Sequence, residues 1–550
     1  MSVSLTINGH TTRVPPGETT LFEHAERLGV RVPTSCHRNG KCKECVVEIA
    51  DGPELLSAPT ASERHLKQNF RLACQARVSA PGGRVSCQTM RRGRMRIERQ
   101  AVRLPAIGTA VPPDPCVRRD GADRILLDGD EIARSTAPIF GIAVDIGTTT
   151  VVVRLLNLET GEQVADAAME NPQRFGGSDV MSRIHYDTTV GEALLMRTLA
   201  GYLGHVIESF PVDPRQIFEA VVVGNTTMRD LFFRQDVYSI GQTPYQSLTE
   251  LDLVGGARST TSLVQSAARA MLPIHPRARV YGGPIISGHV GADAAACMLA
   301  VDLAHEPRLV AIMDIGTNTE LIVGNRDRIV AASCPAGPAF EGGAISCGMP
   351  GLDGAIHSVT IDDADGSIRT SVIGGGAAEG ICGSGLIDLL AELLRTGRMN
   401  EIGRFTGGPN RITLDRARQI HFLESDASAL AQAKAAASAG LRVVFDALGV
   451  SFDAVDVFYL AGGFGRHLDV QASQRIGLIP MLNPGKFVQV GNAAIEGASI
   501  ALLSRGKRQE LEALARRVEH CRLESHPGFF DFFVDGCQFK PLASSPMDVR

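Results

Sequence analysis

Four cysteines near the N-terminus give the strongest chemical signal in this 550-residue sequence. Cys36, Cys42 and Cys45 lie close together, and 28 residues separate Cys45 from Cys74. Four thiolates are the number that a 2Fe–2S cluster requires, two for each iron. A structural zinc site would also accept four thiolates, but such sites usually pair two short C-x2-C knuckles. Because Cys74 stands alone after a strand pattern, we predict a cluster rather than zinc.

The spacing of the cysteines in this loop indicates which class of 2Fe–2S ferredoxin it resembles. The plant-type pattern places four residues between its first two cysteines, whereas five separate Cys36 from Cys42 here. This variant, with the strand and helix patterns that precede it, resembles the vertebrate-type (adrenodoxin-like) ferredoxins. Gly40 would let the loop wrap the cluster and direct backbone N–H groups at its sulfurs, which raises the reduction potential. We interpret His37 as a loop residue, since four cysteines already suffice.

A repeated turn supplies the second signal. Residues 141–156 and 310–325 each read as a buried strand, then Asp-Ile-Gly-Thr-x-Thr, then another strand. Gly147 and Gly316 permit a tight hairpin in which the following N–H and hydroxyl groups face a phosphate. One such turn is weak evidence of a ligand, but two facing copies can clamp one polyphosphate. The repeat therefore predicts a site for a phosphate-rich ligand.

Two aspartates come just before these turns. Asp145 and Asp314 close their strands, where a carboxylate can bind Mg²⁺ through water or position an attacking water. We predict that both are catalytic residues for hydrolysis of the bound polyphosphate.

Two further glycine-rich segments follow the second repeat. The turn Leu460-Ala-Gly-Gly-Phe-Gly-Arg466 comes after an apolar strand pattern, and its glycines at 462, 463 and 465 would let backbone lie against a nucleoside and its α-phosphate. The segment 379–390 is a Gly/Ser turn that opens a helix pattern. It is either another anion site or an ordinary helix start capped by Ser384, and the sequence favours neither.

The other cysteines of the second half suggest no further cluster. Cys334, Cys347 and Cys382 lie within or near glycine-rich turns, where a second metal site is conceivable but buried structural thiols are favoured. Cys521 and Cys537 stand alone near the C-terminus. We therefore expect one cluster in the chain.

The chain falls into three segments whose composition and apolar periodicity differ, and these contain the elements that must position the residues above. Residues 1–88 show short alternating strands with one amphipathic helix, which indicates a small β-rich module. Residues 89–137 lose this periodicity and carry an Arg run and a Pro- and Gly-bearing stretch, so we predict a linker. From residue 138 onward, apolar strands alternate with helices, which indicates sheets covered by helices.

Composition excludes several classes of function. The net charge is −5 and the sequence pI is about 6.3, which gives no support to a general affinity for nucleic acid or anionic membranes. Trp is absent, which argues against base-stacking platforms. No long apolar stretch indicates a membrane span, and the N-terminus lacks the regions of a signal peptide. We expect a cytoplasmic protein.

The two hairpins and the later glycine turn resemble the acetate kinase, sugar kinase, heat-shock chaperone and actin superfamily, in which two related lobes hold ATP in a cleft. The resemblance implies a multidomain fold of the α+β and α/β classes: a β-grasp 2Fe–2S ferredoxin domain, a linker, and a two-lobed actin-like ATPase with lobes at 138–309 and 310–550. It also implies the cofactor-binding residues. These are Gly147, Thr148 and Thr149 in the first phosphate loop, Gly316, Thr317 and Asn318 in the second, and Gly462 and Gly463 in the adenosine motif.

The whole chain resembles the reductive activators of corrinoid-dependent enzymes. Further matching segments are 171–184, 221–228, 334–345 and 471–480. The resemblance implies that an electron from the cluster returns an oxidised Co(II) corrinoid to the methyl-accepting Co(I) state, with ATP hydrolysed. The implied cofactors are a 2Fe–2S cluster, ATP and Mg²⁺. The implied partners are a corrinoid protein of a methyltransferase system, an external low-potential reductant and a second copy of the chain in a homodimer.

Three rival functions share some of these features. A kinase for a small metabolite would use the same ATP fold, but it leaves the cluster without a task. An ATP-gated electron donor to another low-potential enzyme, such as a dehydratase, would use both centres. An actin-like scaffold would polymerise with ATP and would also have no use for the cluster.

Overall fold

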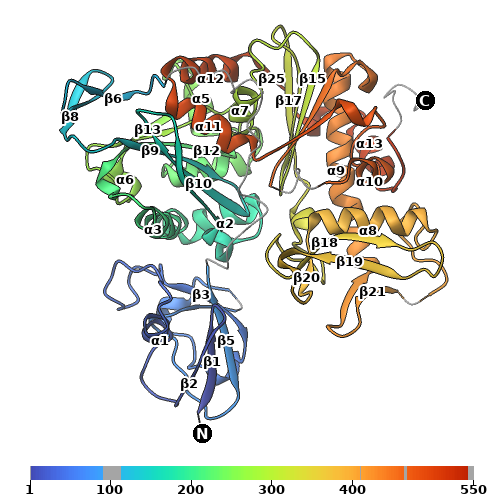
Figure 1. Cartoon of the computed structure of the whole chain (residues 1–550), viewed down its shortest axis with the longest axis horizontal. Coiled ribbons are helices and arrows are strands. Elements are labelled where there is room, and N and C mark those ends of the chain that lie inside the picture. The colour runs from blue at the N-terminus through green and yellow to red at the C-terminus, as the bar shows by residue number, and fades with distance from the viewer. Residues whose placement is uncertain (1, 68, 91–112, 409, 464–467, 543–550) are drawn as a thin grey trace.

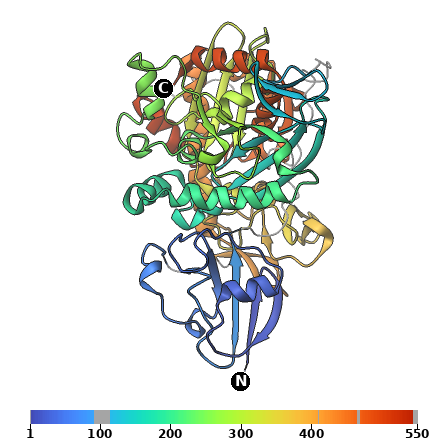
Figure 2. The same ribbon diagram turned by 90° about the vertical axis from the view of Figure 1, so that its left-hand side faces the viewer.

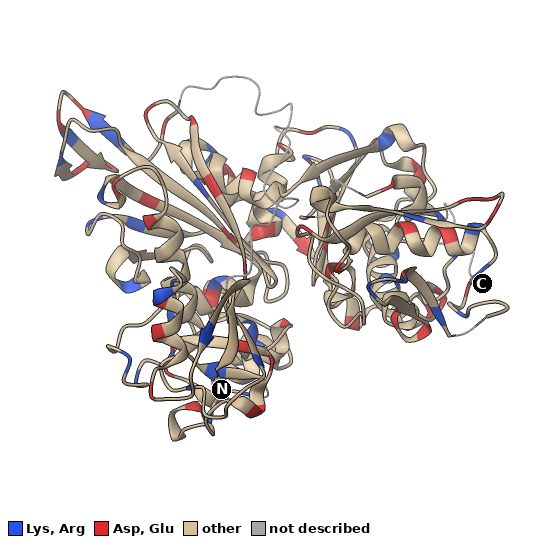
Figure 3. Cartoon of the chain, turned by 60° about the horizontal axis from the view of Figure 1, so that its bottom comes forward, with Lys and Arg blue, Asp and Glu red and all other residues tan. Residues whose placement is uncertain are grey.

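The computed structural model describes residues 2–67, 69–90, 113–408, 410–463 and 468–542. Along the chain there follow a small N-terminal unit, a first lobe and a second lobe, and the N-terminal unit lies beneath the first lobe (Figure 1). Basic and acidic residues are interspersed over all three parts (Figure 3). No helix within these described ranges is long and apolar enough to cross a membrane.

The N-terminal unit is a five-stranded mixed sheet with one helix across it, which confirms the predicted β-grasp fold. The strand order is β2-β1-β5-β3-β4, with β1 parallel to β5. Val3, Leu5 and Ile7 alternate into the core, and Thr20 caps the helix through a reciprocal pair of hydrogen bonds with Glu23. The elements are β1 (Val3–Ile7), β2 (His10–Val14), α1 (Leu21–Arg27), β3 (Val46–Asp51), η1 (Pro53–Leu55), η2 (Ala61–Glu63), β4 (Phe70–Leu72) and β5 (Arg84–Thr89).

The segment predicted as a linker, 89–137, has regular structure in its second part. Its residues 91–112 lie outside the described residues. Beyond them a three-stranded antiparallel sheet forms from β6 (Val117–Asp120), β7 (Arg124–Leu127) and β8 (Asp130–Arg134). Val117, Ile125 and Ile132 bury one face of this small sheet against the first lobe. The strands are four or five residues long, too short to leave a clear period-two pattern beside the Arg-rich stretch.

The first lobe is built on a six-stranded sheet of order β11-β10-β9-β12-β14-β13. Strands β9 and β12 are parallel neighbours in its centre and are buried along their whole length, as continuous apolar strands should be. The elements are β9 (Phe140–Ile146), β10 (Thr150–Asn157), β11 (Gln163–Glu170), η4 (Pro172–Gly176), α2 (Val180–Val190), α3 (Leu194–Glu208), η5 (Pro214–Gln216), β12 (Ile217–Gly224), α4 (Thr226–Phe232), η6 (Tyr238–Gly241), α5 (Leu248–Val254), β13 (Leu263–Ser266), α6 (Ala267–Ala270), β14 (Arg279–Gly282) and α7 (Ala292–Ala300).

The second lobe repeats this plan in a sheet of order β24-β23-β15-β16-β17-β25. In both lobes the first strand forms a hairpin with the second and pairs in parallel with a later strand, β12 or β23. The predicted two-lobed fold is therefore confirmed by matching topology. The sheet elements are β15 (Val310–Ile315), β16 (Thr319–Gly324), β17 (Ile329–Cys334), β23 (Val457–Ala461), β24 (Phe487–Gly491) and β25 (Val518–His520).

An additional layer of helices and short sheets completes the second lobe, at the right and lower right of Figure 1. Glycine at 385 lets α8 begin close to β18, because a Cβ there would lie 2.4 Å from the Ile356 carbonyl oxygen. The elements are η7 (Pro338–Glu341), β18 (Ala355–Ile361), β19 (Ile368–Val372), η8 (Ile373–Gly375), β20 (Gly380–Ile381), α8 (Gly383–Arg395), β21 (Arg411–Asp415), β22 (Ile420–Leu423), α9 (Glu424–Leu448), η9 (Phe452–Ala454), α10 (Val470–Arg475), η11 (Pro484–Lys486), η12 (Leu523–Ser525) and α13 (Phe529–Gly536).

Two helices from the segment 310–550 pack against the first lobe instead of the second. Helices α11 (Ala493–Leu503) and α12 (Arg505–Arg517) return to the first lobe, where α11 packs on β9, β12 and α7 (Figure 1). A Cβ at Gly497 would lie 2.0 Å from the Ala296 carbonyl oxygen, so α11 and α7 cross in close contact. Arg154 of β10 forms a buried ion pair of 2.7 Å with Glu496 of α11. The boundary expected at residue 310 therefore marks where the second sheet begins in the chain, but two helices that come after it pack against the first lobe.

Candidate functional site

The four predicted cluster cysteines come together at one end of the N-terminal sheet. The thiols lie in two interacting pairs, Cys36 with Cys42 and Cys45 with Cys74, since each thiol of a pair lowers or raises the pKa of the other. Cys36 is partly exposed, whereas the other three are buried. Two adjacent pairs are the arrangement that two irons with two thiolates each require. The residues present therefore fit a 2Fe–2S cluster.

The backbone of the loop directs N–H groups at these sulfurs, as the sequence predicted. Burial alone would raise the pKa of Cys36, but loop N–H groups and the Cys42 thiol lower it to about 7. The Cys45 thiol is the main cause that lowers the pKa of Cys74 to about 6, and the Gly40 N–H adds to it. Hydrogen bonds of this kind stabilise thiolates and would stabilise a reduced cluster.

Local geometry explains why a glycine stands inside the loop. Gly40 has φ +80°, and a Cβ there would lie 3.0 Å from the Gln75 side-chain nitrogen. His37 also has positive φ, at 52°, and its side chain is exposed. The exposure of His37 agrees with its interpretation as a loop residue.

The two repeated hairpins face each other across a cleft between the lobes. Thr149 and Thr317 approach to 2.9 Å through their hydroxyl oxygens. Gly147 donates its N–H to the Thr150 carbonyl at 2.9 Å, three residues on, and Gly316 donates to the Asn318 carbonyl at 3.2 Å, two residues on. The predicted phosphate-loop residues, Gly147, Thr148, Thr149, Gly316, Thr317 and Asn318, all line this cleft.

A glutamate that the sequence did not single out joins the two loops. The Glu341 carboxylate accepts a hydrogen bond of 2.8 Å from the Thr149 hydroxyl and another from the Thr317 hydroxyl. Burial raises the pKa of Glu341. It lies at the end of η7, within the segment 334–345 that matched the family pattern without an assigned role.

Buried and partly buried carboxyl groups dominate the cleft. Burial raises the pKa of Asp145 to about 7, of Asp314 to about 6 and of Asp293 to about 8, and the pKa of Glu320 is also raised. Asn492 donates to Asp145 at 2.7 Å. Among the described residues that line the cleft there is no Lys, Arg or His. Such a set of carboxyl groups fits a hard cation that prefers oxygen ligands, such as Mg²⁺.

Asp293, Glu320 and Asn492 were also missed by the sequence reasoning. Asp293 stands in the first turn of α7. Asn492 follows β24, one of the parallel strands, and caps α11. The position at the end of a parallel strand is the signal that could have indicated Asn492.

The predicted adenosine motif lies at the same cleft. Gly462 and Gly463 line it beside the second phosphate loop, and the Gly462 N–H donates to the Gly491 carbonyl at 3.0 Å. Gly462 has φ +98°, and a Cβ there would lie 2.4 Å from the Ile315 carbonyl oxygen. The rest of the motif, Gly465 and Arg466, lies outside the described residues.

The remaining candidates do not join this site. Ser384 does not cap α8: Cys382 is the N-cap residue, and the Ser384 hydroxyl donates to the His357 carbonyl at 2.9 Å. The Cys382 thiol contacts the Ile356 carbonyl oxygen at 3.4 Å, and burial raises the pKa of Cys347 to about 12. Cys334 is fully buried on β17 against α9. These are the contacts of structural thiols.

Three segments match known domain families. Residues 5–79 match the 2Fe-2S iron-sulfur cluster binding domain, residues 140–306 match the RACo middle region, and residues 308–548 match the C-terminal domain of RACo, the ASKHA domain. These matches supply a cluster-binding unit and a nucleotide-binding fold in one chain.

Relatives over most of the chain agree with these matches. The corrinoid activation enzyme RamQ of Eubacterium limosum is 33% identical, with 73% of this chain and 70% of the relative covered. The [Co(II) methylated amine-specific corrinoid protein] reductase of Methanosarcina barkeri is 26% identical, with 72% and 76% covered. A solved structure of a reductive activator for corrinoid, iron-sulfur protein shows 28% identity and a TM-score of 0.72 over 98% of both chains. The chain therefore belongs to the RACo family of reductive activators, with an N-terminal 2Fe–2S domain and a C-terminal ASKHA domain.

Proposed function

We propose that this chain is an ATP-dependent reductive activator of a corrinoid protein, in which one electron passes from the 2Fe–2S cluster to Co(II) and restores Co(I) for methyl transfer. One observation carries the proposal: a paired-cysteine loop and a carboxyl-rich nucleotide cleft lie in one chain, and the cluster-binding unit shares its hydrophobic core with the first lobe. The activities in the names of the relatives support a corrinoid protein as the electron acceptor.

Cys36, Cys42, Cys45 and Cys74 would hold the cluster, which when bound supplies a single electron at low potential. Plant-type clusters have potentials near −400 mV, and Co(II) in a corrinoid protein is harder to reduce than that. For one electron a gap of 59 mV changes the equilibrium tenfold, so a shortfall of roughly 100 mV costs about 2.3 kcal/mol. Nucleotide binding or hydrolysis would offset this cost.

Different residues of the cleft would bind different parts of the nucleotide. We assign the phosphates to the N–H and hydroxyl groups of Gly147, Thr148 and Thr149 in one loop and of Gly316, Thr317 and Asn318 in the other. Gly462 and Gly463 would contact the nucleoside. Asp145 and Asp314 would hold Mg²⁺ through water and orient the attacking water, since both line the cleft, Asp145 buried and Asp314 partly buried.

The contacts between the two loops suggest how nucleotide alters conformation. Thr149 and Thr317 donate to Glu341 in the structure, and the same hydroxyl groups would donate to a polyphosphate that enters between the loops. The lobes would then change their relative position. ATP would act on conformation rather than as a phosphoryl donor to a substrate.

The proposal includes further partners and a cellular setting. An external low-potential reductant would refill the cluster, and two copies of the chain would form a homodimer. All twelve cysteines are free, which suits a reducing compartment such as the cytoplasm.

An anaerobic assay with excess chemical reductant tests the function. The protein is mixed with a Co(II)-loaded corrinoid protein with and without Mg-ATP, and the Co(I) absorbance is recorded. We expect Co(I) only with ATP, none with Cys42→Ser, and wild-type rates with the control Cys521→Ser, which changes a cysteine remote in sequence from the cluster loop. Asp314→Asn should keep the cluster absorbance but lose ATP hydrolysis and Co(I) formation.

Two outcomes would favour a rival function. No Co(I) from several corrinoid proteins, with an intact cluster and measurable ATP hydrolysis, would point to a donor for another low-potential enzyme. Phosphorylation of a small metabolite by Cys42→Ser protein at the wild-type rate would point to a kinase.

A further inference from the structure

The segment 171–184 holds the first phosphate loop from the side away from the cleft. The Asn171 side chain donates to the Gly147 carbonyl at 2.8 Å, and the Asn171 N–H donates to the Thr149 carbonyl at 2.6 Å. Arg183 donates to the carbonyl of Thr148, between these two, at 2.6 Å. Three consecutive carbonyls of the loop are thus fixed by two residues that are at most 1% exposed, two carbonyls through side chains and one through the backbone N–H of Asn171. The loop cannot move without this segment or without loss of these bonds.

Arg183 brings a buried positive charge to the back of the same loop. Its other donors meet neutral acceptors: the Gly177 carbonyl at 3.0 Å, the Met228 sulfur at 3.0 Å and the Gln173 side-chain oxygen at 3.5 Å. A buried cation on neutral acceptors is stabilised by any anion that arrives nearby. A polyphosphate on the other side of the loop would therefore attract Arg183 toward the cleft.

The same segment also contacts the cluster-binding unit. Arg174 of η4 forms an ion pair with Glu48 of β3, with 2.6 Å between Arg174 Nη2 and Glu48 Oε2. Its guanidinium also lies over the Phe70 ring, 5.9 Å from the centroid. Glu48 follows Cys45 by three residues on the strand that leaves the cluster loop. One turn of helix therefore separates the contacts to the phosphate loop from the contact to the cluster-binding unit.

This connecting turn is rigid. Pro172 fixes the start of η4, where the Asn171 side chain accepts a hydrogen bond from the Gln173 N–H at 2.9 Å. Phe175 packs edge-on against Tyr186 of α2, with 5.5 Å between ring centroids. A displacement at Asn171 is thus passed to Arg174 with little loss.

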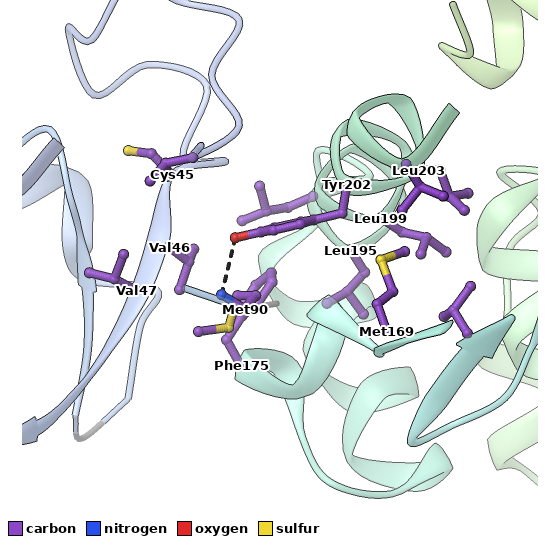
Figure 4. Packing of buried hydrophobic residues seen from close by; sticks show 14 of the residues in the cluster. Cys45, Val46, Val47, Met90, Met169, Phe175, Leu195, Leu199, Tyr202 and Leu203 are labelled. Atoms are coloured by element: carbon purple, nitrogen blue, oxygen red, sulfur yellow. Dashed lines mark hydrogen bonds between the residues drawn. The ribbon is translucent and has the colours of Figure 1, made fainter. Parts of the chain in front are cut away.

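The cluster-binding unit is docked on α3 by its cluster-bearing end, and α3 lies between this unit and the first-lobe sheet (Figure 2). The Met90 N–H donates to the Tyr202 hydroxyl at 3.0 Å, among apolar side chains of both units (Figure 4). Arg197 donates to the Cys42 carbonyl at 2.7 Å. The docked face thus includes the backbone of Cys42, one of the predicted cluster ligands.

We propose that residues 171–184 couple the first phosphate loop to the docking of the cluster-binding unit, so that nucleotide in the cleft pulls η4 away from Glu48 and loosens the docked face on α3. Asn171, Arg174 and Arg183 are the positioning residues of this coupling. The inference rests on the proposed nucleotide site. It gives the nucleotide a route to the cluster that does not pass through the second lobe.

Hydrogen–deuterium exchange of the full-length, cluster-loaded protein tests the coupling. Peptides that cover 42–48, 86–90 and 194–204 report the docked face, and they are compared with and without a non-hydrolysable ATP analogue and Mg²⁺. In the wild type, nucleotide should speed their exchange by about fivefold, the effect of losing one partly buried ion pair. Arg174→Ala should exchange about fivefold faster without nucleotide and respond little to it.

A matched control lies on the same interface. Arg31 pairs with Glu208 of α3 at 2.6 Å, and both side chains are largely exposed. Arg31→Ala should keep both the basal exchange and the nucleotide response of the wild type. Titration calorimetry should show that Arg174→Ala binds nucleotide up to about fivefold more tightly than the wild type, because the variant no longer loses the Arg174–Glu48 pair on binding.

The outcomes separate this inference from the proposed function. If nucleotide binds the wild type and supports Co(I) formation but leaves the exchange of the docked face unchanged or slower, the coupling is wrong and the function stands. If Arg174→Ala keeps wild-type exchange and response, the coupling is also wrong. If no nucleotide binds the wild-type protein, both the coupling and the proposed function are wrong.

Discussion

Replacing Gly462 by alanine tests the position of the nucleotide in the cleft. Gly462 has φ +98°, and a Cβ there would lie 2.4 Å from the Ile315 carbonyl oxygen and 2.9 Å from Asp314 Oδ1. Real Cβ atoms essentially never come within 3.0 Å of such atoms. The second phosphate loop, which begins directly after Ile315, must therefore shift.

Two costs follow from this shift. An alanine in the left-handed region costs about 1–2 kcal/mol of folding stability. Displacement of the loop should also break about two hydrogen bonds to the phosphates, at about 1 kcal/mol each. A loss of about 2 kcal/mol in binding weakens the affinity for nucleotide roughly thirtyfold.

Gly449→Ala is the matched control for backbone strain. Gly449 has φ +77° at the C-terminus of α9, and a Cβ there would meet no atom within 4 Å. Both variants should lower the melting temperature, but titration calorimetry with Mg-ATP should show weaker binding only for Gly462→Ala. Wild-type affinity in a destabilised Gly462→Ala protein would refute the assignment of Gly462 to the nucleotide site.

Two predictions concern the stability of the fold. Burial lowers the pKa of Lys434 from 10.5 to about 7, so the unfolded state binds more protons between these values and stability rises with pH by up to roughly 1.4 kcal/mol per pH unit. Lys434→Met should remove this slope in denaturant unfolding at pH 7 and 9; an unchanged slope would show that Lys434 is not its source. Glu496→Gln should leave Arg154 buried without its charged partner and cost about 3–5 kcal/mol in thermal unfolding. The double variant Arg154→Met, Glu496→Leu should recover most of that loss, and no recovery would contradict the ion-pair explanation.

The parts of the site that could be predicted from the sequence are those formed by residues close together in the chain. The cysteine loop and the Asp-Ile-Gly-Thr hairpins carry both their chemistry and their geometry within a few residues, and the structure brings each set together as expected. Fold class followed from the same local patterns, since buried strands that end in glycine turns recur in both lobes.

The missed residues share a different property. Asp293, Glu341 and Asn492 reach the cleft only through tertiary packing, from α7, η7 and the start of α11. A lone buried carboxyl or amide has no spacing that marks it in the sequence. The return of α11 to the first lobe likewise depends on the close crossing at Gly497, which no local pattern indicates.

A single-turnover experiment tests the central claim most directly. The cluster is reduced, excess reductant is removed, and the protein is mixed anaerobically with an equal amount of Co(II) corrinoid protein, with and without Mg-ATP. The cluster signal is followed by electron paramagnetic resonance and Co(I) by absorbance. The account predicts that Mg-ATP makes both change at the same rate, one Co(I) for each cluster oxidised. Oxidation of the cluster without Co(I), or Co(I) formed equally well without ATP, would contradict it.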